Sequence, residues 1–570
     1  MSSSTPAATS GPTTKWLAPL LVLMVGSFLP PMDSGIVNVA IPHIQKDLGG
    51  GVDDIAWVST AYSLGLAVFV PLSNYLADRL GLTLLHRVTM IGFLIGSTLC
   101  GLAWDRNSLI AFRVLAAIPG SIVPVVTITM IYRIVPKNKI GTAMGLYGLG
   151  VAVAPSMGPT LGGLLVEDLS WRWIFHFKTP IGVLTVIAGL LLLPKLGKAE
   201  VVHRFDWWGF LTFSYGLAAL IVVTAKGQKW HWGSYLVMIL AASAVISLAL
   251  FAVIELEVEH PLIDLRVLKS WPFVNSLLLI GVLMVGLFAM VYYLPQFLQS
   301  AQGLTSRNTG LVMLPMGLMM AVMVPIAGLL YDRVGPRWPA LIGLSGTVVG
   351  AYLLATGINV DMTRPEAAFW AMIAVLGGGL GLMPIMTNGL NWLPAHLVGH
   401  GGALNNVMQR VASALGVAAM GVLVARESAQ LSSDRAALET TATMPQYAGA
   451  GQETLLGLYQ QTQLRVQALS YADMFIATAG ATLIGVVLVL MLRRPPPAPA
   501  AVPTPRPPDR TGTAADDRDD RDERGVRDDR ELVATGNGRS GRDGPADGGG
   551  ARDVGGRAGR ERATIARPGG

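Results

Sequence analysis

Two related stretches decide the fold of this chain, "NYLADRLGLTLLHR" at residues 74–87 and "GLLYDRVGPRWPAL" at residues 328–341. Aligned with each other, they pair Asp78-Arg79 with Asp332-Arg333 and Gly81 with Gly335, at an offset of 254 residues. An internal repeat at that distance indicates that the chain consists of two related halves. Each copy lies beside long apolar runs, so the halves are made of membrane-crossing segments.

The composition places both halves in a lipid bilayer. Of the 570 residues, 52% are hydrophobic and 14% are charged, and the mean hydropathy is +0.51. Apolar runs long enough to cross about 30 Å of hydrocarbon lie near residues 16–42, 55–77, 86–103, 108–132, 140–166, 173–194, 207–225, 234–254, 273–296, 308–330, 338–357, 366–394, 402–425 and 471–492. The sequence therefore predicts an all-α, polytopic membrane protein of 14 transmembrane helices, arranged 6+2+6, because the repeat offset corresponds to eight spans. Two six-helix halves of this kind are typical of a transporter.

The predicted organisation has five parts. A cytoplasmic N-terminus covers residues 1–15, a six-helix bundle residues 16–194, and two linker helices with their loops residues 195–272. A second six-helix bundle covers residues 273–492 and includes an external polar loop at 426–469, which is rich in Gln, Ser, Thr and Ala and is expected to be partly helical. The tail, 493–570, holds 16 Lys/Arg and 14 Asp/Glu. It has too little apolar surface to fold, so we expect it to be disordered and cytoplasmic.

Basic residues set the predicted orientation. Lys and Arg cluster in alternate loops, as at Arg133, Lys137 and Lys139, whereas the loops opposite hold scattered single charges such as Lys46 and Arg106. By the positive-inside rule, both termini are cytoplasmic and the protein is multi-pass in the inner (cytoplasmic) membrane. The net charge of +6 therefore reflects orientation in the lipid bilayer, and no basic patch with interleaved aromatics suggests nucleic acid as a partner.

Two ionisable residues stand inside apolar runs. Asp33 lies in "PPMDSGIVNVAIP", residues 30–42, and Arg113 in "LIAFRVLAAIPG", residues 109–120. A charged side chain near the middle of a span costs about 2.5–3.5 kcal/mol on insertion scales, so such residues usually face a cavity and mark a proton or ion pathway. Burial also favours the neutral form of a carboxylate, which allows proton exchange. The alternative for both residues is a structural role, in which each anchors a neighbouring helix.

Signatures of enzymes and cofactor sites are missing. No nucleotide-binding GxxxxGK[ST] motif or zinc-binding HExxH motif occurs, and Cys100 is the single cysteine. His396 and His400 are four residues apart, but no acid is close in sequence, which favours solvated histidines over a metal pair. We expect no enzymatic activity, no metal and no cofactor, with a proton gradient as the energy source.

The motifs resemble those of the major facilitator superfamily, in its fourteen-span drug:proton antiporter branch. Asp78-Arg79-x-Gly81 is similar to the superfamily's loop signature, and "MDSGIVNVAIP" at residues 32–42 to the branch's first-span motif. Further similar segments are "APSMGPTLGG" at 154–163, "WRWIFHFKTPIG" at 171–182, "FDWWGFL" at 205–211, "HPLIDLRVLK" at 260–269 and "GGALNNVMQRVASALGVA" at 401–418. Together they extend the resemblance over residues 16–492.

The resemblance implies roles for individual residues. Asp33 and Arg113 would take part in proton coupling. A conformational latch would be formed by Asp78, Arg79, Gly81, Asp332, Arg333 and Gly335, and a bending antiporter helix by Pro155, Gly158, Pro159, Gly162 and Gly163. The residues that could contact substrate or pair charges are Asn38, Lys178, Asn406 and Arg410.

Lys178 has three possible roles in the sixth span. It could sense substrate charge, pair with an acid such as Asp33, or extend to the outer interface near Trp171 and Trp173. The two tryptophans favour the third role.

The function implied by the resemblance is proton-coupled efflux, by antiport, of small hydrophobic and often cationic drugs across the cytoplasmic membrane. The same scaffold could instead export an endogenous lipid, siderophore or antibiotic, or take up a substrate by symport. The antiporter-like segment at residues 154–163 argues against symport. A membrane receptor or scaffold that transports nothing is the alternative from a different class.

Overall fold

The structure, a computed structural model, describes residues 16–49, 51–197, 204–359, 362–438 and 452–493. The predicted segment 1–15 and the tail beyond residue 493 lie outside the described residues, as do some side chains within the helices. All regular secondary structure in the described ranges is helical, which confirms the all-α prediction. Helices satisfy every backbone polar group within one segment, and this is what a chain needs in hydrocarbon.

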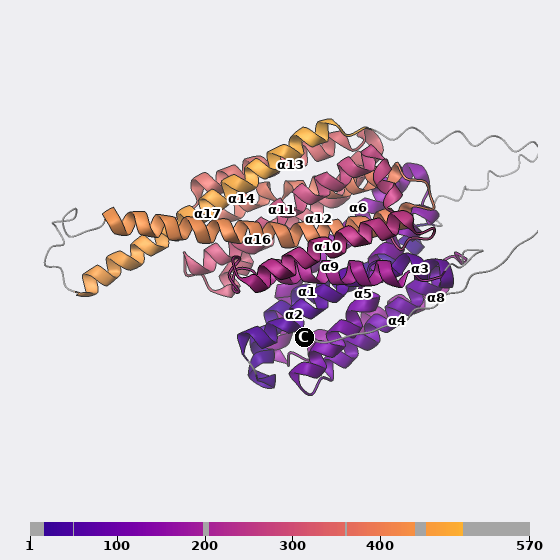
Figure 1. Cartoon of the computed structure of the whole chain (residues 1–570), viewed down its shortest axis with the longest axis horizontal. Coiled ribbons are helices and arrows are strands. Elements are labelled where there is room, and N and C mark those ends of the chain that lie inside the picture. The colour runs from indigo at the N-terminus through magenta and orange to yellow at the C-terminus, as the bar shows by residue number, and fades with distance from the viewer. Residues whose placement is uncertain (1–15, 50, 198–203, 360–361, 439–451, 494–570) are drawn as a thin grey trace, which may run out of the picture. The chain divides into compact units, whose positions relative to one another are not determined.

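Figure 1 shows the helices. They are α1 (Leu17–Leu48), α2 (Val52–Val68), α3 (Leu72–Leu80), α4 (Leu82–Gly101), α5 (Arg106–Ile134), α6 (Ile140–Asp168), α7 (Trp173–His176), α8 (Lys178–Leu192), α9 (Trp207–Lys226) and α10 (Tyr235–Glu257). The chain continues through α11 (Trp271–Ser300), α12 (Ser306–Val334), α13 (Arg337–Gly357), α14 (Arg364–Ala374), a π-helical turn (Gly377–Gly381), α15 (Leu382–Asn391), α16 (Val398–Leu438) and α17 (Gln452–Leu490).

Twelve helical stretches among the described residues are long and apolar enough to cross a membrane. They include Leu17–Val37 near the N-terminus and Gln460–Leu490 near the end of the described chain. α2 contributes a shorter apolar helix, Trp57–Val68. α6 is 29 residues long and packs on both α1 and α12. The chain is therefore a polytopic membrane protein.

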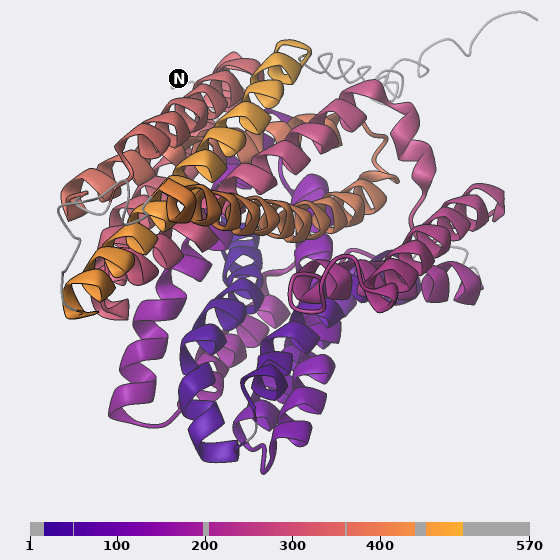
Figure 2. The same cartoon turned by 60° about the vertical axis from the view of Figure 1, so that its left-hand side comes forward.

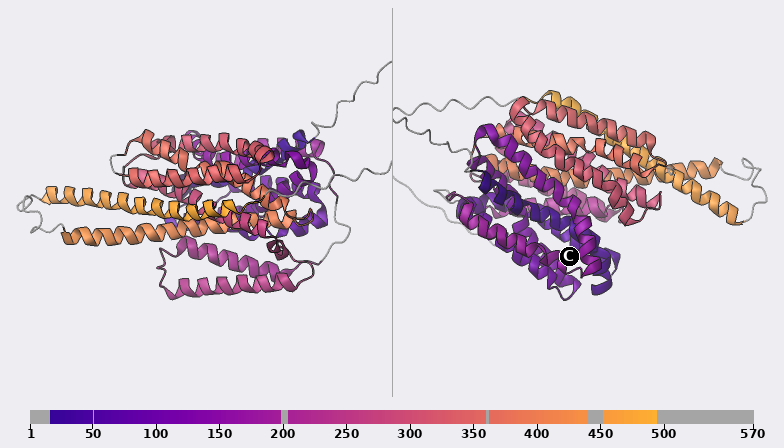
Figure 3. Two further views of the ribbon diagram at one scale, coloured as in Figure 1. Left: turned by 90° about the horizontal axis from the view of Figure 1, so that it is seen from above. Right: turned by 180° about the vertical axis from the view of Figure 1, so that it is seen from behind.

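The helices form two groups with a separate pair between them in the sequence. Figure 2 shows most of α1 to α8, in indigo and purple, below α11 to α17, in pink to yellow, and α6 packs on α12 between the two groups. α9 and α10 pack on each other as a pair and contact the remaining helices mainly through α9, which touches α2 and α16 (Figure 3, left). We call α1–α8 the first half, α11–α17 the second half, and α9–α10 the linker pair.

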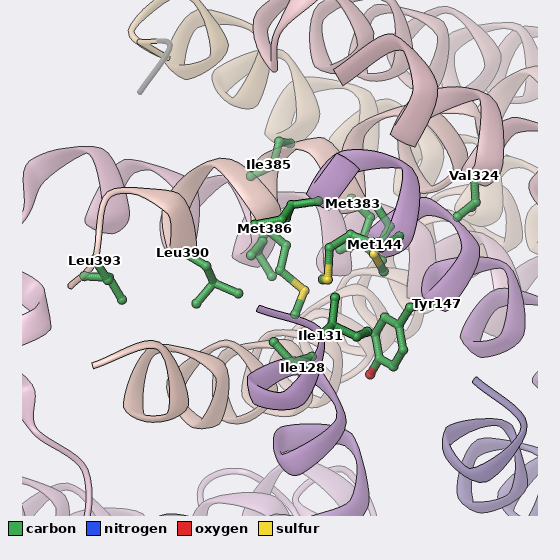
Figure 4. Packing of buried hydrophobic residues seen from close by; sticks show 14 of the residues in the cluster. Ile128, Ile131, Met144, Tyr147, Val324, Met383, Ile385, Met386, Leu390 and Leu393 are labelled. Carbon is green, nitrogen blue, oxygen red and sulfur yellow. The ribbon is translucent and has the colours of Figure 1, made fainter. Parts of the chain in front are cut away.

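The two halves meet at the end of the bundle that holds Asp78-Arg79 and Asp332-Arg333, here called the Asp-Arg end. A large buried apolar cluster crosses from one half to the other at this end. Figure 4 shows its members: Ile128 and Ile131 of α5, Met144 and Tyr147 of α6, Val324 of α12, and Met383, Ile385, Met386, Leu390 and Leu393 of α15 and the residues after it. This packing leaves the side chains of Met144 and Met386 almost without exposed surface, so the Asp-Arg end is closed.

The segment between α10 and α11 is fixed at the same end. The carbonyl of Leu262 accepts a hydrogen bond from Asn74 Nδ2 at 3.3 Å, and the amide of Asp264 donates to His400 Nδ1 at 3.0 Å. His400 is therefore half-buried and bonded, which corrects the expectation of a solvated histidine, whereas His396 is exposed. This connecting segment is held by both halves at once.

The predicted external loop at 426–469 is largely helical. α16 continues to Leu438 and α17 begins at Gln452, so both helices extend beyond the others (Figures 1 and 3). Residues 426–438, "RESAQLSSDRAAL", contain neither Gly nor Pro and include good helix formers such as Ala, Leu, Glu and Arg. A polar composition does not by itself argue against a helix.

Candidate functional site

Three charged side chains from three helices meet inside the first half. They are Asp33 of α1, Arg113 of α5 and Lys178 at the start of α8, and their side chains are 2%, 1% and 0% exposed. Charged residues are almost never buried to this degree unless they are paired. We call these three residues the ion cluster.

Small residues allow α5 to lie close enough for this meeting. A Cβ placed on Gly65 of α2 would lie 2.6 Å from Ala117, and one placed on Gly96 of α4 would lie 2.7 Å from the Cα of Ala116. The Ala116-Ala117 pair of α5 is thus packed directly against glycines of two neighbouring helices. Close backbone approach between small residues is the usual way in which membrane helices associate. It brings Arg113, one turn earlier, within reach of α1 and α2.

The carboxylate of Asp33 is the acceptor at the centre of the ion cluster. Oδ2 accepts from Nη1 of Arg113, and Oδ1 accepts from Nζ of Lys178. Arg113 also donates from Nε to the carbonyl of Val58 at 3.2 Å, and its guanidinium carbon lies 3.7 Å from the centre of the Tyr62 ring. Both oxygens of Asp33 are therefore committed to cations, and Arg113 is held from two further sides.

Lys178 does not reach the outer interface, so the expectation of an interfacial lysine is wrong. On α8 the buried positions are Lys178, Gly182, Thr185 and Gly189, which recur every three or four residues and form one inward stripe. Because positions i and i+4 of a helix share a face, Lys178 must point where the two glycines point. Gly182 packs against Leu94 of α4, where an added Cβ would lie 2.1 Å from that side chain.

With all three side chains in their ordinary charged forms, the ion cluster carries one uncompensated positive charge. It contains two cations and one anion, and the aromatic rings nearby lie 5.3 Å (Phe175) and 6.0 Å (Phe93) from Lys178 Nζ. Rings attract a cation by only about 0.5–2 kcal/mol, less than a buried ion pair loses when one partner is removed. A buried site of this kind is sensitive to the gain or loss of a single charge, which is the property that a coupling site requires.

Asp332 makes a contact between the two halves at the Asp-Arg end, and we call this contact the Asp332 latch. Its Oδ1 accepts from the amide of Gly141 at 2.9 Å, and its Oδ2 accepts from the amide of Thr142 at 2.7 Å and the Thr142 hydroxyl at 2.5 Å. These are the first residues of α6, so a carboxylate at the end of α12 caps the N-terminus of a helix in the other half. The unpaired amides and the helix dipole both favour an anion at that position.

The matching residues of the first half do not form the same contact. Asp78 and Arg79 are exposed, and Nη1 of Arg79 donates to the hydroxyl of Tyr75 on its own helix at 3.0 Å. Asn74 contacts the second half instead, with its Nδ2 at 3.3 Å from Nδ1 of His400. Gly81 and Gly335 both adopt positive φ, at 81° and 86°, and each ends the helix that carries its Asp-Arg pair. Arg333 is exposed.

Glycines bring α6 and α12 into backbone contact beside the Asp332 latch. A Cβ on Gly328 would lie 2.4 Å from the carbonyl oxygen of Gly141 and 2.7 Å from the Cα of Gly145. Gly328 occupies the repeat position that Asn74 occupies in the first half. Each repeat position therefore makes a tight contact with the opposite half. Gly328 packs on the glycines of α6, and Asn74 packs on Gly399 of α16.

The predicted antiporter helix coincides with α6, which runs unbroken from Ile140 to Asp168. Gly162 faces α1, because a Cβ there would lie 3.1 Å from the carbonyl oxygen of Ile36. Pro155, Gly158, Pro159 and Gly163 are part of the helix, but their surroundings lie outside what the structure describes.

Three of the four residues proposed for substrate contact or charge pairing lie away from the ion cluster or cannot be placed. Asn406 donates from Nδ2 to the carbonyl of Gly402 at 3.1 Å, within its own helix. Arg410 of α16 is half-buried, and its Nε is enclosed without a hydrogen-bond partner among the described residues, although it interacts electrostatically with Tyr62 of α2. The side chain of Asn38 lies outside the described part.

Two contributors to these sites were not identified from the sequence. Tyr62 stacks on Arg113 and bonds weakly to the carbonyl of Pro30 at 3.4 Å, and Thr142 supplies two of the bonds to Asp332. Tyrosine and threonine are common in membrane helices, so neither residue stood out. The one available signal was that Thr142 opens a helix directly after the basic loop at residues 137–139. The described residues contain no group of three or more His, Cys, Asp or Glu that could bind a metal ion.

Comparisons with known proteins show the family and the fold of the chain. A family profile described as "Major Facilitator Superfamily" matches residues 23–417. The tetracenomycin C resistance and export protein of Streptomyces glaucescens is 28% identical over 410 residues, 71% of this chain and 75% of that protein. Multidrug resistance protein Stp of Mycobacterium tuberculosis is 30% identical over 412 residues, 72% of this chain and 76% of that protein. The fold matches the human organic anion transporter MFSD10 (TETRAN) with a TM-score of 0.54 at 13% identity, over 84% of this chain and 100% of that one.

Proposed function

The chain belongs to the Major Facilitator Superfamily, and from this membership we propose that it exports hydrophobic, drug-like compounds across the bacterial inner membrane in exchange for protons. Members of this family are transporters and not enzymes, and relatives that share about 30% of the sequence are named for drug resistance or antibiotic export. The observation that carries the proposal is the ion cluster. Three buried charges from three helices, with one charge in excess, have a cost that a purely structural site would avoid.

The proposed mechanism is alternating access between the two halves. We count fourteen spans, by adding α2 and α6 to the twelve, and we place both termini and the Asp-Arg end in the cytoplasm. With the Asp332 latch formed and the apolar cluster packed, a substrate cavity between the two halves, as expected of this transporter fold, would be closed to the cytoplasm. Export requires this closed end to open, which separates Asp332 from the first turn of α6 and Gly328 from Gly145.

Proton coupling would work through the charge of the ion cluster. Binding a proton or losing one changes the net charge buried between α1, α5 and α8 by one unit. At an effective dielectric constant of 20, a unit charge interacts with another 4 Å away by about 4 kcal/mol. That energy exceeds the contribution of a hydrogen bond to a charged group, which is about 1.5–3 kcal/mol, so it is sufficient to bias the position of one half against the other. A proton that enters down a potential of 100 mV supplies about 2.3 kcal/mol.

The test compares wild type with Asp33→Asn in cells that accumulate ethidium. We expect wild type to extrude the dye and to slow when the pH gradient is collapsed, and we expect Asp33→Asn to lose most of this gradient-dependent efflux. Lys46→Met, which changes an exposed lysine at the end of α1, is the matched control and should behave as wild type. Efflux by Asp33→Asn that equals wild type with and without the gradient would refute the proposal.

Export of an endogenous antibiotic is a second candidate function. It is favoured by the 28% identity to a protein named for resistance to and export of tetracenomycin C. Deletion of the gene in its native host separates the two functions. Loss of a secreted metabolite would support the second candidate, whereas sensitivity to added drugs alone would support the first.

A further inference from the structure

The arrangement of the ion cluster identifies which of its members exchanges the proton. We propose that the transported proton is carried by Nζ of Lys178, while Asp33 remains an anion and serves as its partner. This inference rests on the proposed function and deepens it, because it assigns proton carriage to a residue that the sequence had suggested was interfacial.

Arg113 cannot be the carrier. A guanidinium keeps its proton in proteins, and this one is fixed by the carboxylate of Asp33, the carbonyl of Val58 and the ring of Tyr62. The choice therefore lies between adding a proton to Asp33 and removing one from Lys178.

Adding a proton to Asp33 is unfavourable in this geometry. Both carboxylate oxygens accept from cations, so a proton on either oxygen would displace a charged donor. The product would be two buried cations with no anion between them, and like charges this close disfavour each other strongly. An uncompensated buried charge costs several kcal/mol.

Removing a proton from Lys178 has the opposite effect. The products are a neutral amine and the Asp33–Arg113 ion pair, so the buried site becomes electrically neutral. The amine keeps two N–H groups and can still donate to Oδ1 of Asp33. Lysine also loses its charge on burial far more readily than arginine.

The other described side chains around the ion cluster are aromatic rings and a thiol. From α4 and from the residues before α8, Lys178 faces the rings of Phe93 and Phe175. On α2, Tyr62 faces Arg113, and the thiol of Cys100 on α4 also interacts electrostatically with Arg113. In the described part of the chain, Asp33 of α1 is the one carboxylate that is bonded to Lys178.

The proton step balances without any other reactant. An Nζ–H bond of the ammonium breaks, the proton passes to water on the side where the cavity is open, and the nitrogen keeps the electron pair. On the opposite side that electron pair accepts a proton from water and the ammonium is restored. A cationic substrate near Asp33 would favour loss of the proton from Lys178, which makes substrate and proton alternatives for one site.

The experiment uses the full chain in lipid nanodiscs and four variants: Lys178→Arg, Lys178→Met, Asp33→Asn and the control Lys46→Met. Proton release on addition of ethidium is followed with the pH indicator pyranine. Wild type and Lys46→Met should release about one proton per bound dye, by linkage of the two equilibria. Lys178→Met and Lys178→Arg should release none, because one has no proton to lose and the other cannot lose it. Lys178→Arg retains the ion pair and guards against failure of the Met variant to fold.

Infrared difference spectra between acid and alkaline pH give a second readout that needs no dye. We expect no protonated-carboxyl C=O band that depends on Asp33, so the spectra of wild type and Asp33→Asn should match in that region. A band that disappears in Asp33→Asn would put the proton on Asp33 and overturn the inference. Proton release by Lys178→Met at the wild-type level would overturn it as well. If wild type releases no proton and its efflux does not depend on the pH gradient, the proposed function itself is refuted.

Discussion

The carboxylate of Asp332 accepts hydrogen bonds from both the amide and the hydroxyl of Thr142, at 2.7 Å and 2.5 Å. These bonds join the end of α12 in one half to the start of α6 in the other. Asp78, its counterpart in the repeat, is exposed and makes no equivalent contact in the described part of the chain. Two copies of one motif thus have different roles in the state described here. One copy contacts the other half through Asp332, while the first-half copy does so through Asn74.

Asp332→Asn should weaken closure of the Asp-Arg end. The amide side chain keeps an acceptor oxygen but loses the charge, and charge-assisted bonds are about twice as strong as neutral ones. We expect a loss of about 1–2 kcal/mol, which shifts the balance toward the open end about tenfold. Met386→Cys in a Cys100→Ser background reports this shift, because position 386 is buried in the closed end. In inside-out membrane vesicles, its labelling by a membrane-impermeant thiol reagent should accelerate with Asp332→Asn and change far less with Asp78→Asn. Equal acceleration by both would contradict the asymmetry.

Gly328→Ala should abolish transport without unfolding the protein. The new methyl group would lie 2.4 Å from a backbone oxygen and 2.7 Å from a backbone Cα of α6, and neither atom can move without the whole helix. Gly310→Ala in the same helix is the control, because a Cβ there meets no atom within 4 Å. We expect ethidium efflux, normalised to protein in the membrane, to fall at least about tenfold for Gly328→Ala. An active Gly328→Ala would show that α6 and α12 do not need this contact.

Tyr62→Leu should impair the ion cluster, and Tyr62→Phe should not. The ring lies 3.7 Å from the guanidinium of Arg113, where a desolvated cation–π contact is worth about 2 kcal/mol. Phenylalanine keeps the ring and loses only the long 3.4 Å bond to Pro30. Gradient-driven efflux should therefore drop by about tenfold or more for leucine and stay near wild type for phenylalanine. If both variants lost activity equally, the hydroxyl would be the essential group.

Arg410→Met should improve export of cationic dyes and leave proton coupling intact. The arginine is half-buried, and no ion-pair partner is found for it among the described residues, so it repels a cation in the membrane interior without being neutralised. For a dye charge about 10 Å away at an effective dielectric constant of 20, the removed repulsion is about 1.7 kcal/mol. Concentration dependence of efflux should show a lower KM for ethidium and no such change for a neutral substrate. A higher KM would mean that Arg410 contacts the dye favourably.

Asp47→Asn should destabilise the end of the bundle opposite the Asp-Arg end, in a pH-dependent manner. Asp47 accepts from Nε1 of Trp171 at 2.9 Å and from Arg172 at 2.7 Å, and these bonds lower the pKa of its carboxyl below the ordinary value of 3.8. A lowered pKa means that the contribution to stability is complete above the ordinary value and disappears as the pH falls through the folded-state value. Because the pair is about half exposed, the effect is at most about 1 kcal/mol. Thermal unfolding should therefore give a higher melting temperature for wild type than for Asp47→Asn at pH 7. The difference between the two melting temperatures should vanish in strong acid. A difference in melting temperature that does not depend on pH would mean that Asp47 stabilises the protein through packing and not through its charge.

The sequence predicted the fold well because the spans are set by one strong physical requirement. Runs that are apolar over about 20 residues must be helices in hydrocarbon, and the positions of α1, α4, α5 and α8–α13 follow those runs. The ends were less predictable. The helical extensions at residues 426–438 and 452–469 are polar, so no argument from hydrocarbon applied to them, and only local helix propensity could have indicated them.

The candidate site was predicted in part. Asp33 and Arg113 stood out because each is a lone charge in an apolar run, but their direct contact depends on how α1 and α5 pack. Lys178 was assigned to the interface from its nearness in sequence to Trp171. Its spacing from Gly182 and Gly189 carries the opposite information, because small residues mark the face on which helices approach. Helical periodicity should therefore be considered before sequence distance when a charge lies near the end of a span.

The length of α16 has a mechanical consequence. At 1.5 Å per residue its 41 residues extend for about 60 Å, roughly twice the hydrocarbon thickness. A rigid rod of this length amplifies rotation, so a tilt of 10° about one end moves the other by about 10 Å. Small tilts of α16 within the membrane would therefore be measurable at its far end, as changes in the distance between two spectroscopic labels.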